Sequence, residues 1–206
     1  MQLSAIKIKL LEAKQLDEVV ELDRLSLGGI WTLKQYRQEL SLANSRLLAI
    51  LPSTRITATA RDSQQQLSIL GLGGWRAIAN EAKITILAIH PDYQGMGLGQ
   101  LLLLTLLKEA SQQGLKYARL EVRASNQSAQ SLYQKFGFQI VQKLPNYYHQ
   151  FQEDALMLYY GYLNQPQFKQ NLAIWQQQID RKLLKNGISK GDGLLAPTDN
   201  VTSSRR

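Results

Sequence analysis

The sequence contains no cysteine and only two histidines, His90 and His149. The lack of cysteine excludes disulfide bonds, thiolate metal ligands and any covalent intermediate on a thiol. With two histidines and no thiolate, a structural zinc cluster is not expected, and we expect the functional site to need no metal. The two histidines themselves we interpret as turn or solvent-facing residues.

Long hydrophobic runs are also missing. The most apolar stretch, Leu98 to Leu107, is interrupted by Gly99 and Gln100 and is too short to cross a bilayer. The first residues lack the basic and apolar regions of a signal peptide. We therefore expect a cytoplasmic protein that does not contact the membrane.

Acidic residues are fewer than basic residues, and the formal net charge is +8. Such a charge can indicate nucleic-acid binding. However, the basic residues are scattered, and the segment 164–206 alone, with seven basic and three acidic residues, supplies half of the net charge. Because no aromatic RNA-binding motif accompanies them, we do not expect nucleic acid as a direct partner.

Strand and helix patterns alternate along the first 160 residues. Alternating or continuous apolar residues predict strands at 6–10, 46–51, 67–76, 83–89, 116–123, 138–142 and 155–160. Helical spacing predicts helices at 16–27, 31–42, 98–113 and 125–136. This order predicts an α/β fold, with a mixed sheet covered by helices on both faces.

Two segments fall outside this pattern. Residues 53–66 are polar and aperiodic, and we interpret them as a long exposed hairpin connection. We divide the chain into a domain at 1–163, an amphipathic helical extension at 164–186 and a disordered tail at 187–206. The apolar face of the extension comprises Phe168, Leu172, Trp175, Ile179 and Leu183.

The loop from Gln94 to Gly99 lies between an apolar strand and an apolar helix. Gly97 and Gly99 let backbone N–H groups approach a phosphate, and the helix N-terminus adds a favourable dipole. A tight strand-to-helix turn would explain the glycines equally well. The loop lacks the Lys-Ser/Thr pair of a phosphate-binding NTPase loop and the third glycine of a dinucleotide fingerprint. Phosphoryl transfer and hydride transfer are therefore disfavoured.

Gln94-x-x-Gly97-x-Gly99 resembles motif A of the GNAT family of N-acetyltransferases, and residues 132–138 are similar to the family's LYxKxGF element. The resemblance covers about residues 6–160. It implies the GNAT fold, with a mostly antiparallel twisted sheet, and acetyl-CoA as co-substrate. It also implies donor contacts through the strand and the loop, at Leu87, Ala88, Ile89, Gln94, Gly95, Met96, Gly97, Leu98, Gly99 and Gln100.

A narrower similarity is to the RimI group, whose members acetylate the N-terminal alanine of a small-subunit ribosomal protein. It rests on residues 90–94, 120–126, 146–148 and 154–157, with Leu-Glu-Val-Arg-Ala-Ser-Asn at 120–126 the most specific part. The similarity implies acetyl transfer to a ribosomal protein N-terminus or another peptide amine, and the absence of cysteine favours a direct transfer without an acyl-enzyme intermediate. Lysine side chains or small amines as acceptors, and a non-catalytic acetyl-CoA- or ribosome-binding module, remain alternatives.

The resemblance also implies roles for three polar residues. Glu121 is the expected general base for the amine, although a surface carboxylate paired with Arg119 or Arg123 would look the same. Tyr133 is the expected general acid for the departing thiolate, although its helical spacing equally suits a core residue. Asn126 is expected to contact CoA, although it is also placed as a helix N-cap.

The acceptor side is less well defined by the sequence. Trp31, Tyr147 and Tyr148 are expected to contact the acceptor peptide, with core packing or half-exposed loop positions as the alternatives. Pro145 stands where the RimI group has a basic residue, and residues 53–66 and the segment after Asn164 are additional. Because the additional segments can reshape the acceptor groove, these departures point to a broader specificity than one ribosomal protein. We expect a monomer or a weak dimer.

Overall fold

The computed structural model describes residues 5–53 and 68–191. Its strands are β1 Ala5–Leu10, β2 Ser45–Pro52, β3 Gly71–Ile78, β4 Glu81–Ile89, β5 Tyr117–Arg123, β6 Gln139–Tyr148, β7 Glu153–Gly161 and β8 Ser189–Lys190. Its α-helices are α1 Leu16–Leu27, α2 Leu33–Ser41, α3 Leu98–Gln112, α4 Gln127–Lys135 and α5 Pro166–Lys185. Short 3-10 helices occupy Ala13–Gln15, Pro91–Tyr93 and His149–Phe151.

The eight strands form one sheet in the order β6-β7-β5-β4-β3-β2-β1-β8. Its pairs are antiparallel except β4 with β5 and β1 with β8, which are parallel. The strand predicted to be central, β4, lies inside the sheet between β3 and β5. The prediction of a mixed, mostly antiparallel sheet is confirmed.

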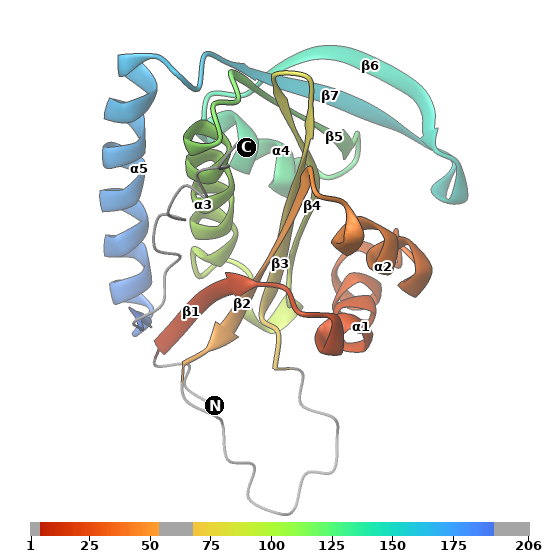
Figure 1. The fold of residues 1–206 in the computed structure, drawn as a ribbon, viewed down its shortest axis with the longest axis horizontal. Coiled ribbons are helices and arrows are strands. Elements are labelled where there is room, and N and C mark those ends of the chain that lie inside the picture. Colours follow the sequence, from red (N-terminus) through yellow and green to blue (C-terminus); the bar gives the residue numbers. More distant parts are fainter. Residues whose placement is uncertain (1–4, 54–67, 192–206) are drawn as a thin grey trace, which may run out of the picture.

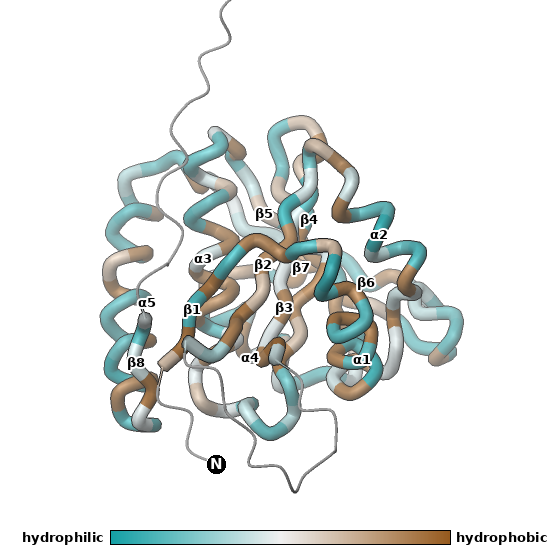
Figure 2. Tube along the Cα trace, turned by 60° about the horizontal axis from the view of Figure 1, so that its bottom comes forward, coloured by the Kyte–Doolittle hydropathy of each residue, from teal (hydrophilic) through white to brown (hydrophobic). Residues whose placement is uncertain are grey.

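Helices cover both faces of this sheet, as predicted (Figure 1). One buried cluster joins the sheet to α3, α4 and α5, and a second joins the other face to α1 and α2. Figure 2 shows hydrophilic residues along the outer sides of α2 and α5, on opposite sides of the molecule. The amphipathic pattern of both helices therefore decides which face each one buries.

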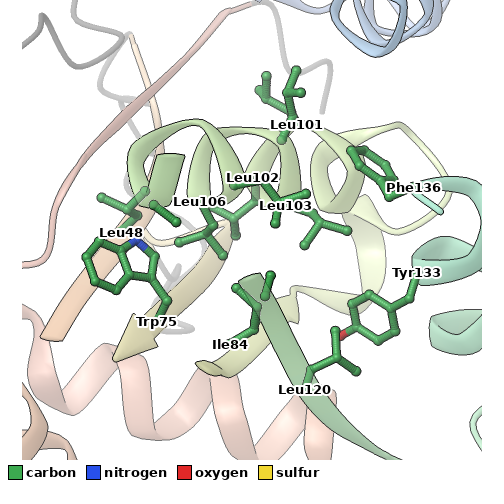
Figure 3. Close-up of a cluster of buried hydrophobic side chains, with 14 of the residues drawn as sticks. Leu48, Trp75, Ile84, Leu101, Leu102, Leu103, Leu106, Leu120, Tyr133 and Phe136 are labelled. Atoms are coloured by element: carbon green, nitrogen blue, oxygen red, sulfur yellow. The ribbon is translucent and has the colours of Figure 1, made fainter. Parts of the chain in front are cut away.

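Helix α3 packs closely on β3, because Gly73 has no side chain between the strand and the helix. A Cβ built on Gly73 would lie 2.8 Å from Cγ of Leu102 and 3.0 Å from Cδ1 of Leu106. Figure 3 shows these leucines of α3 packed among the buried side chains of the sheet. The close contact fixes the helix, and therefore the loop that precedes it, against the strands.

The sheet opens between β4 and β5, both of which lie entirely within the described residues. The two strands are paired only from Glu81–Tyr117 to Lys83–Arg119. Immediately afterwards Thr85 forms a bulge in β4, since consecutive residues of β3 face Ile86 and Ile84. A bulge bends its strand and increases the local twist. The C-terminal halves of β4 and β5 are thereby separated, and the space between them becomes the candidate site.

The connection from α1 to α2 is held by a buried carboxylate that the sequence pattern did not reveal. Asp23 is fully buried, and its oxygens accept hydrogen bonds from the backbone N–H of Ile30 (3.0 Å), the backbone N–H of Trp31 (2.8 Å) and the hydroxyl of Tyr36 (2.9 Å). Burial and the neighbouring carboxylate raise the pKa of the Tyr36 phenol. This arrangement places the segment around Ile30 at the edge of the site.

Substituting Asp23→Ala is expected to lower the free energy of unfolding by about 3 kcal/mol, because the buried Tyr36 hydroxyl and two partly buried backbone N–H groups lose their acceptor. Urea denaturation followed by circular dichroism measures the change. The control is Asp17→Ala, on an exposed position of the same helix, which should cost less than about 1 kcal/mol. Equal effects of the two substitutions would contradict the anchoring role of Asp23.

Several predicted boundaries were wrong. Strand β3 begins at Gly71 rather than 67, and β6 continues to Tyr148, so the two adjacent tyrosines lie in a strand and not in a connecting segment. The predicted disordered tail is also wrong for its first residues: Ile188 is buried, and the N–H of Gly191 donates to the carbonyl of Ile6 at 2.8 Å. Residues 54–67 and 192–206, which cover most of the predicted hairpin and tail, lie outside the described residues.

Candidate active site

The loop after β4 presents free backbone donors at the start of α3. Gly95 and Gly97 have φ of 76° and 101°, in the left-handed region that favours glycine. Gly97 is the N-cap of α3, and since it has no side chain it cannot cap the helix amides. The first hydrogen bond of the helix runs from the N–H of Leu101 to the carbonyl of Gly97 at 3.0 Å. The amides of residues 98–100 therefore have no partner within the helix, which leaves them available to bind an anion.

A cavity of about 710 Å³ lies between this loop, the end of β4 and helix α4. Nine of the eleven residues predicted to contact the donor line it: Leu87, Ala88, Ile89, Gln94, Gly95, Gly97, Gly99, Gln100 and Asn126. The other two, Met96 and Leu98, do not line it, and the side chain of Leu98 is buried in the core. The structure thus gathers the predicted donor contacts around one cavity.

The exposed edge of β4 runs along this cavity. The carbonyl of Ile89 accepts hydrogen bonds from Ser26 Oγ (2.9 Å) and from Gln94 Nε2 (3.0 Å), so it points away from β3. Because backbone direction alternates along a strand, the N–H and C=O of Leu87 point the same way. Gln94 holds the loop against the strand end, while Leu87 offers an unpaired backbone edge to a ligand.

A smaller cavity of about 80 Å³ adjoins the first one, where β4 and β5 separate. Thr85 of β4 and Glu121 of β5 lie along its wall, together with Ile30 from the anchored segment. The Glu121 side chain is only 8% exposed, and its Oε2 lies 3.2 Å from Nζ of Lys83. The ion pair with Arg119 or Arg123 that the sequence suggested is not formed: Arg119 pairs with Glu81, and Arg123 stacks on Phe151.

Tyr133 lies where the two cavities meet, since it lines both. Its ring packs against Phe138 with centroids 5.9 Å apart, and Figure 3 shows its oxygen directed toward Leu120 of β5. Burial raises the pKa of its phenol above the usual value, and the neighbouring Tyr148 adds to this effect. Tyr133 is therefore a core residue that also lines both cavities, and its phenol is protonated at neutral pH.

The predicted acceptor residues are placed differently from one another. Tyr148 lines the smaller cavity and donates its hydroxyl to the backbone carbonyl of Glu121 at 3.1 Å, and burial raises its pKa to about 12. Tyr147 is 41% exposed and does not line either cavity. Trp31 packs on Tyr36, with ring centroids 5.1 Å apart, and does not line them either.

Asn126 has the N-cap role that the sequence offered, and its CoA contact stays a prediction. It is the N-cap of α4, and its side chain accepts the N–H of Ala129 at 3.0 Å. It also lines both cavities.

Sequence reasoning missed other residues of the larger cavity, among them the cations Arg123, Lys135 and Lys182. Arg123 lies in the motif at 120–126 and Lys135 in the motif at 132–138, so both could have been proposed as cavity residues from the sequence.

The comparisons with known proteins agree with this geometry. The model of the acetyltransferase (GNAT) family matches residues 16–138. A protein of Bacillus subtilis (strain 168), named as a candidate ribosomal protein bS18-alanine N-acetyltransferase, is 30% identical over 152 residues, which cover 74% of this chain and 93% of that protein. The chain belongs to the acetyltransferase (GNAT) family, and the resemblance seen in its sequence is confirmed.

Two further comparisons concern Escherichia coli. The ribosomal protein bS18-alanine N-acetyltransferase of strain K12 is 39% identical over 85 residues, which cover 40% of this chain and 57% of that protein. The crystal structure of the Escherichia coli ribosomal-protein-S18-alanine N-acetyltransferase aligns with a TM-score of 0.63 at 25% identity, over 76% of this chain and 94% of that one. The chain is thus an acyltransferase, as a member of this family. The names of its relatives describe enzymes that acetylate a ribosomal protein.

No helix among residues 5–53 and 68–191 is long and apolar enough to cross a membrane. The same residues contain no group of three or more histidine, aspartate or glutamate side chains that could hold a metal ion.

Proposed function

We propose that this protein transfers the acetyl group of acetyl-CoA directly to the N-terminal α-amine of a protein, and that the acceptor is the N-terminal alanine of a small-subunit ribosomal protein. The names of its relatives from Bacillus subtilis and Escherichia coli support the acceptor. The observation that carries the proposal is the meeting of two cavities at Tyr133, one next to an anion-binding loop and the other next to Glu121.

The larger cavity suits the donor. The free amides at the start of α3 and the glycines of the loop fit a pyrophosphate, which needs close backbone approach and positive potential. The exposed edge at Leu87 fits an amide-containing arm, because such an arm pairs with a strand as another strand would. Bound there, acetyl-CoA supplies an activated thioester.

The smaller cavity suits the acceptor amine. An α-amine has a pKa of about 7.7–8.0 and must lose a proton before it attacks. Glu121 accepts this proton at its carboxylate, directly or through one water. Its 8% exposure and its ion pair with Lys83 hold the carboxylate in one place. Tyr148, which is hydrogen-bonded to the backbone of Glu121, forms the adjacent wall.

Tyr133 completes the proton transfers. Tyr133 lines both cavities, and its raised pKa keeps its hydroxyl protonated at neutral pH. It donates that proton to the departing sulfur, which avoids release of a free thiolate. The site therefore has a proton acceptor on the amine side and a proton donor at the junction.

The acceptor is tested with two peptides of one ribosomal sequence that begins with alanine and contains lysine, one with a free and one with an acetylated N-terminus. We expect acetylation of the free peptide at its α-amine only, located by tandem mass spectrometry. Acetylation of the blocked peptide would show that lysine is the acceptor, and no acetylation of either peptide would contradict the proposed acceptor.

A further inference from the structure

Helix α5 lies beyond residues 16–138, which the family model matches, but it is built into the core. It packs beside α3 (Figure 1), and its Phe168, Ile179 and Leu183 are all buried. Trp175 stacks on Phe136, with ring centroids 4.7 Å apart. The helix therefore has a fixed position relative to α3 and α4, the two helices that border the larger cavity.

The chain after α5 fastens the helix at its C-terminal end. Strand β8 pairs with the start of β1, and the side chain of Ile188 is buried beside it. Lys190 forms an ion pair with Asp180 of α5, which also accepts a hydrogen bond from Gln176 at 2.9 Å. The C-terminal half of α5 is thus tied to the segment that follows it.

The last turn of α5 lies on the loop that begins α3. A Cβ placed on Gly97 would be 3.4 Å from Cδ of Lys182 and 3.5 Å from Cδ2 of Leu183. The side-chain amide of Asn186 lies 3.5 Å from the carbonyl of Met96 in the same loop. The stem of Lys182 therefore runs across the glycine whose conformation exposes the loop amides.

Lys182 is also part of the cavity wall. Its side chain is half-buried and lines the larger cavity together with Arg123 and Lys135. The described residues that line this cavity include no aspartate or glutamate. A cation beside free amides, with no carboxylate to neutralise it, favours a phosphate ligand.

We propose that Lys182 is a donor-binding residue, whose ammonium group contacts a phosphate of acetyl-CoA bound at the Gly95–Gly99 loop. This inference rests on the proposed function, because it takes acetyl-CoA as the donor. It assigns to α5 the role of an additional wall of the donor site. The competing explanation is that Lys182 only interacts with the dipole at the C-terminus of its own helix.

The test is isothermal titration calorimetry of acetyl-CoA with the whole chain and with Lys182→Gln. We expect the Kd to rise roughly tenfold, since one charge-assisted hydrogen bond at a half-exposed site is lost. The control is Lys169→Gln, an exposed position near the other end of α5 with the same change in charge. It should leave the Kd within about twofold of the original, because exposed charges that far apart are screened.

Acetyl-CoA lacking the 3′-phosphate identifies the phosphate that is contacted. If Lys182→Gln weakens binding of this analogue as well, the pyrophosphate is the partner; if the effect disappears, it is the 3′-phosphate. Both results support the proposal. Unchanged affinity of Lys182→Gln for acetyl-CoA, with tight binding by the unsubstituted chain, would overturn it. Failure of the unsubstituted chain to bind acetyl-CoA would instead overturn the proposed function.

Discussion

Replacement of Glu121 by glutamine is expected to lower the rate of acetyl transfer roughly 10²–10⁴-fold, the range typical of a lost general base. The amide cannot accept the proton of the attacking amine, yet it fills the same volume on β5. Because Glu121 lines the smaller cavity and not the larger one, the Kd for acetyl-CoA should be unchanged. Single-turnover kinetics with an alanine-initiated peptide and calorimetry with the donor measure the two quantities.

A matched substitution separates catalysis from charge balance. Glu81 is also a carboxylate of the sheet and forms an ion pair with Arg119, but it lies where β4 and β5 are still paired and does not line either cavity. Glu81→Gln should leave the transfer rate within about twofold, as expected for a partly exposed ion pair away from the site. Equal rates for Glu81→Gln and Glu121→Gln would remove Glu121 from the mechanism.

The donor side of the site was predictable because its signals are local. Glycines at positions 97 and 99, between an apolar strand and an apolar helix, place backbone amides at a helix start whatever the rest of the fold. The alternation in β5 likewise predicted which residues are buried: Ala118, Leu120 and Val122 lie in the core, and Glu121 lies on the other face. Helix α4 and its cap at Asn126 follow from equally short patterns.

The acceptor side depends on long-range geometry that no local pattern reveals. The bulge at Thr85 separates β4 from β5, but Thr85 looks like an ordinary strand residue in an apolar stretch. The partner of Glu121 proved to be Lys83, on a neighbouring strand 38 positions earlier in the chain, and not an adjacent arginine. Strand β6 was cut short in the prediction because its residues are mostly exposed, and exposure weakens the apolar signal on which strand prediction rests.

The same reasoning explains why Lys182 was missed. The helical period of residues 164–186 predicted an amphipathic helix, and α5 formed at Pro166–Lys185. Periodicity shows that a helix has an apolar face but not which surface that face will cover. Only the packing of α5 along α3 brings Lys182 over Gly97, so the charge of the extension could be counted in the sequence but not located.

Tyr133→Phe is the second substitution for which we expect a large effect, a decrease of roughly 10²-fold in the transfer rate, the lower end of the range for a lost general acid. The substitution removes one oxygen and keeps the ring that packs on Phe138. Folding stability and the Kd for acetyl-CoA should therefore remain near their original values. The control is Tyr160→Phe, which removes a hydroxyl from the same aromatic cluster, beside Phe138, but away from both cavities.

The pH dependence gives this assignment an independent test. With the original chain the rate should rise with pH as the acceptor α-amine deprotonates near its pKa of about 7.7–8.0. Because burial raises the pKa of Tyr133 above the value of about 10 for a free phenol, its hydroxyl stays protonated across this range. The rate should therefore show no decline below about pH 10 from loss of the acid. A decline near pH 8–9, or a rate for Tyr133→Phe equal to that of Tyr160→Phe, would show that the departing sulfur obtains its proton elsewhere.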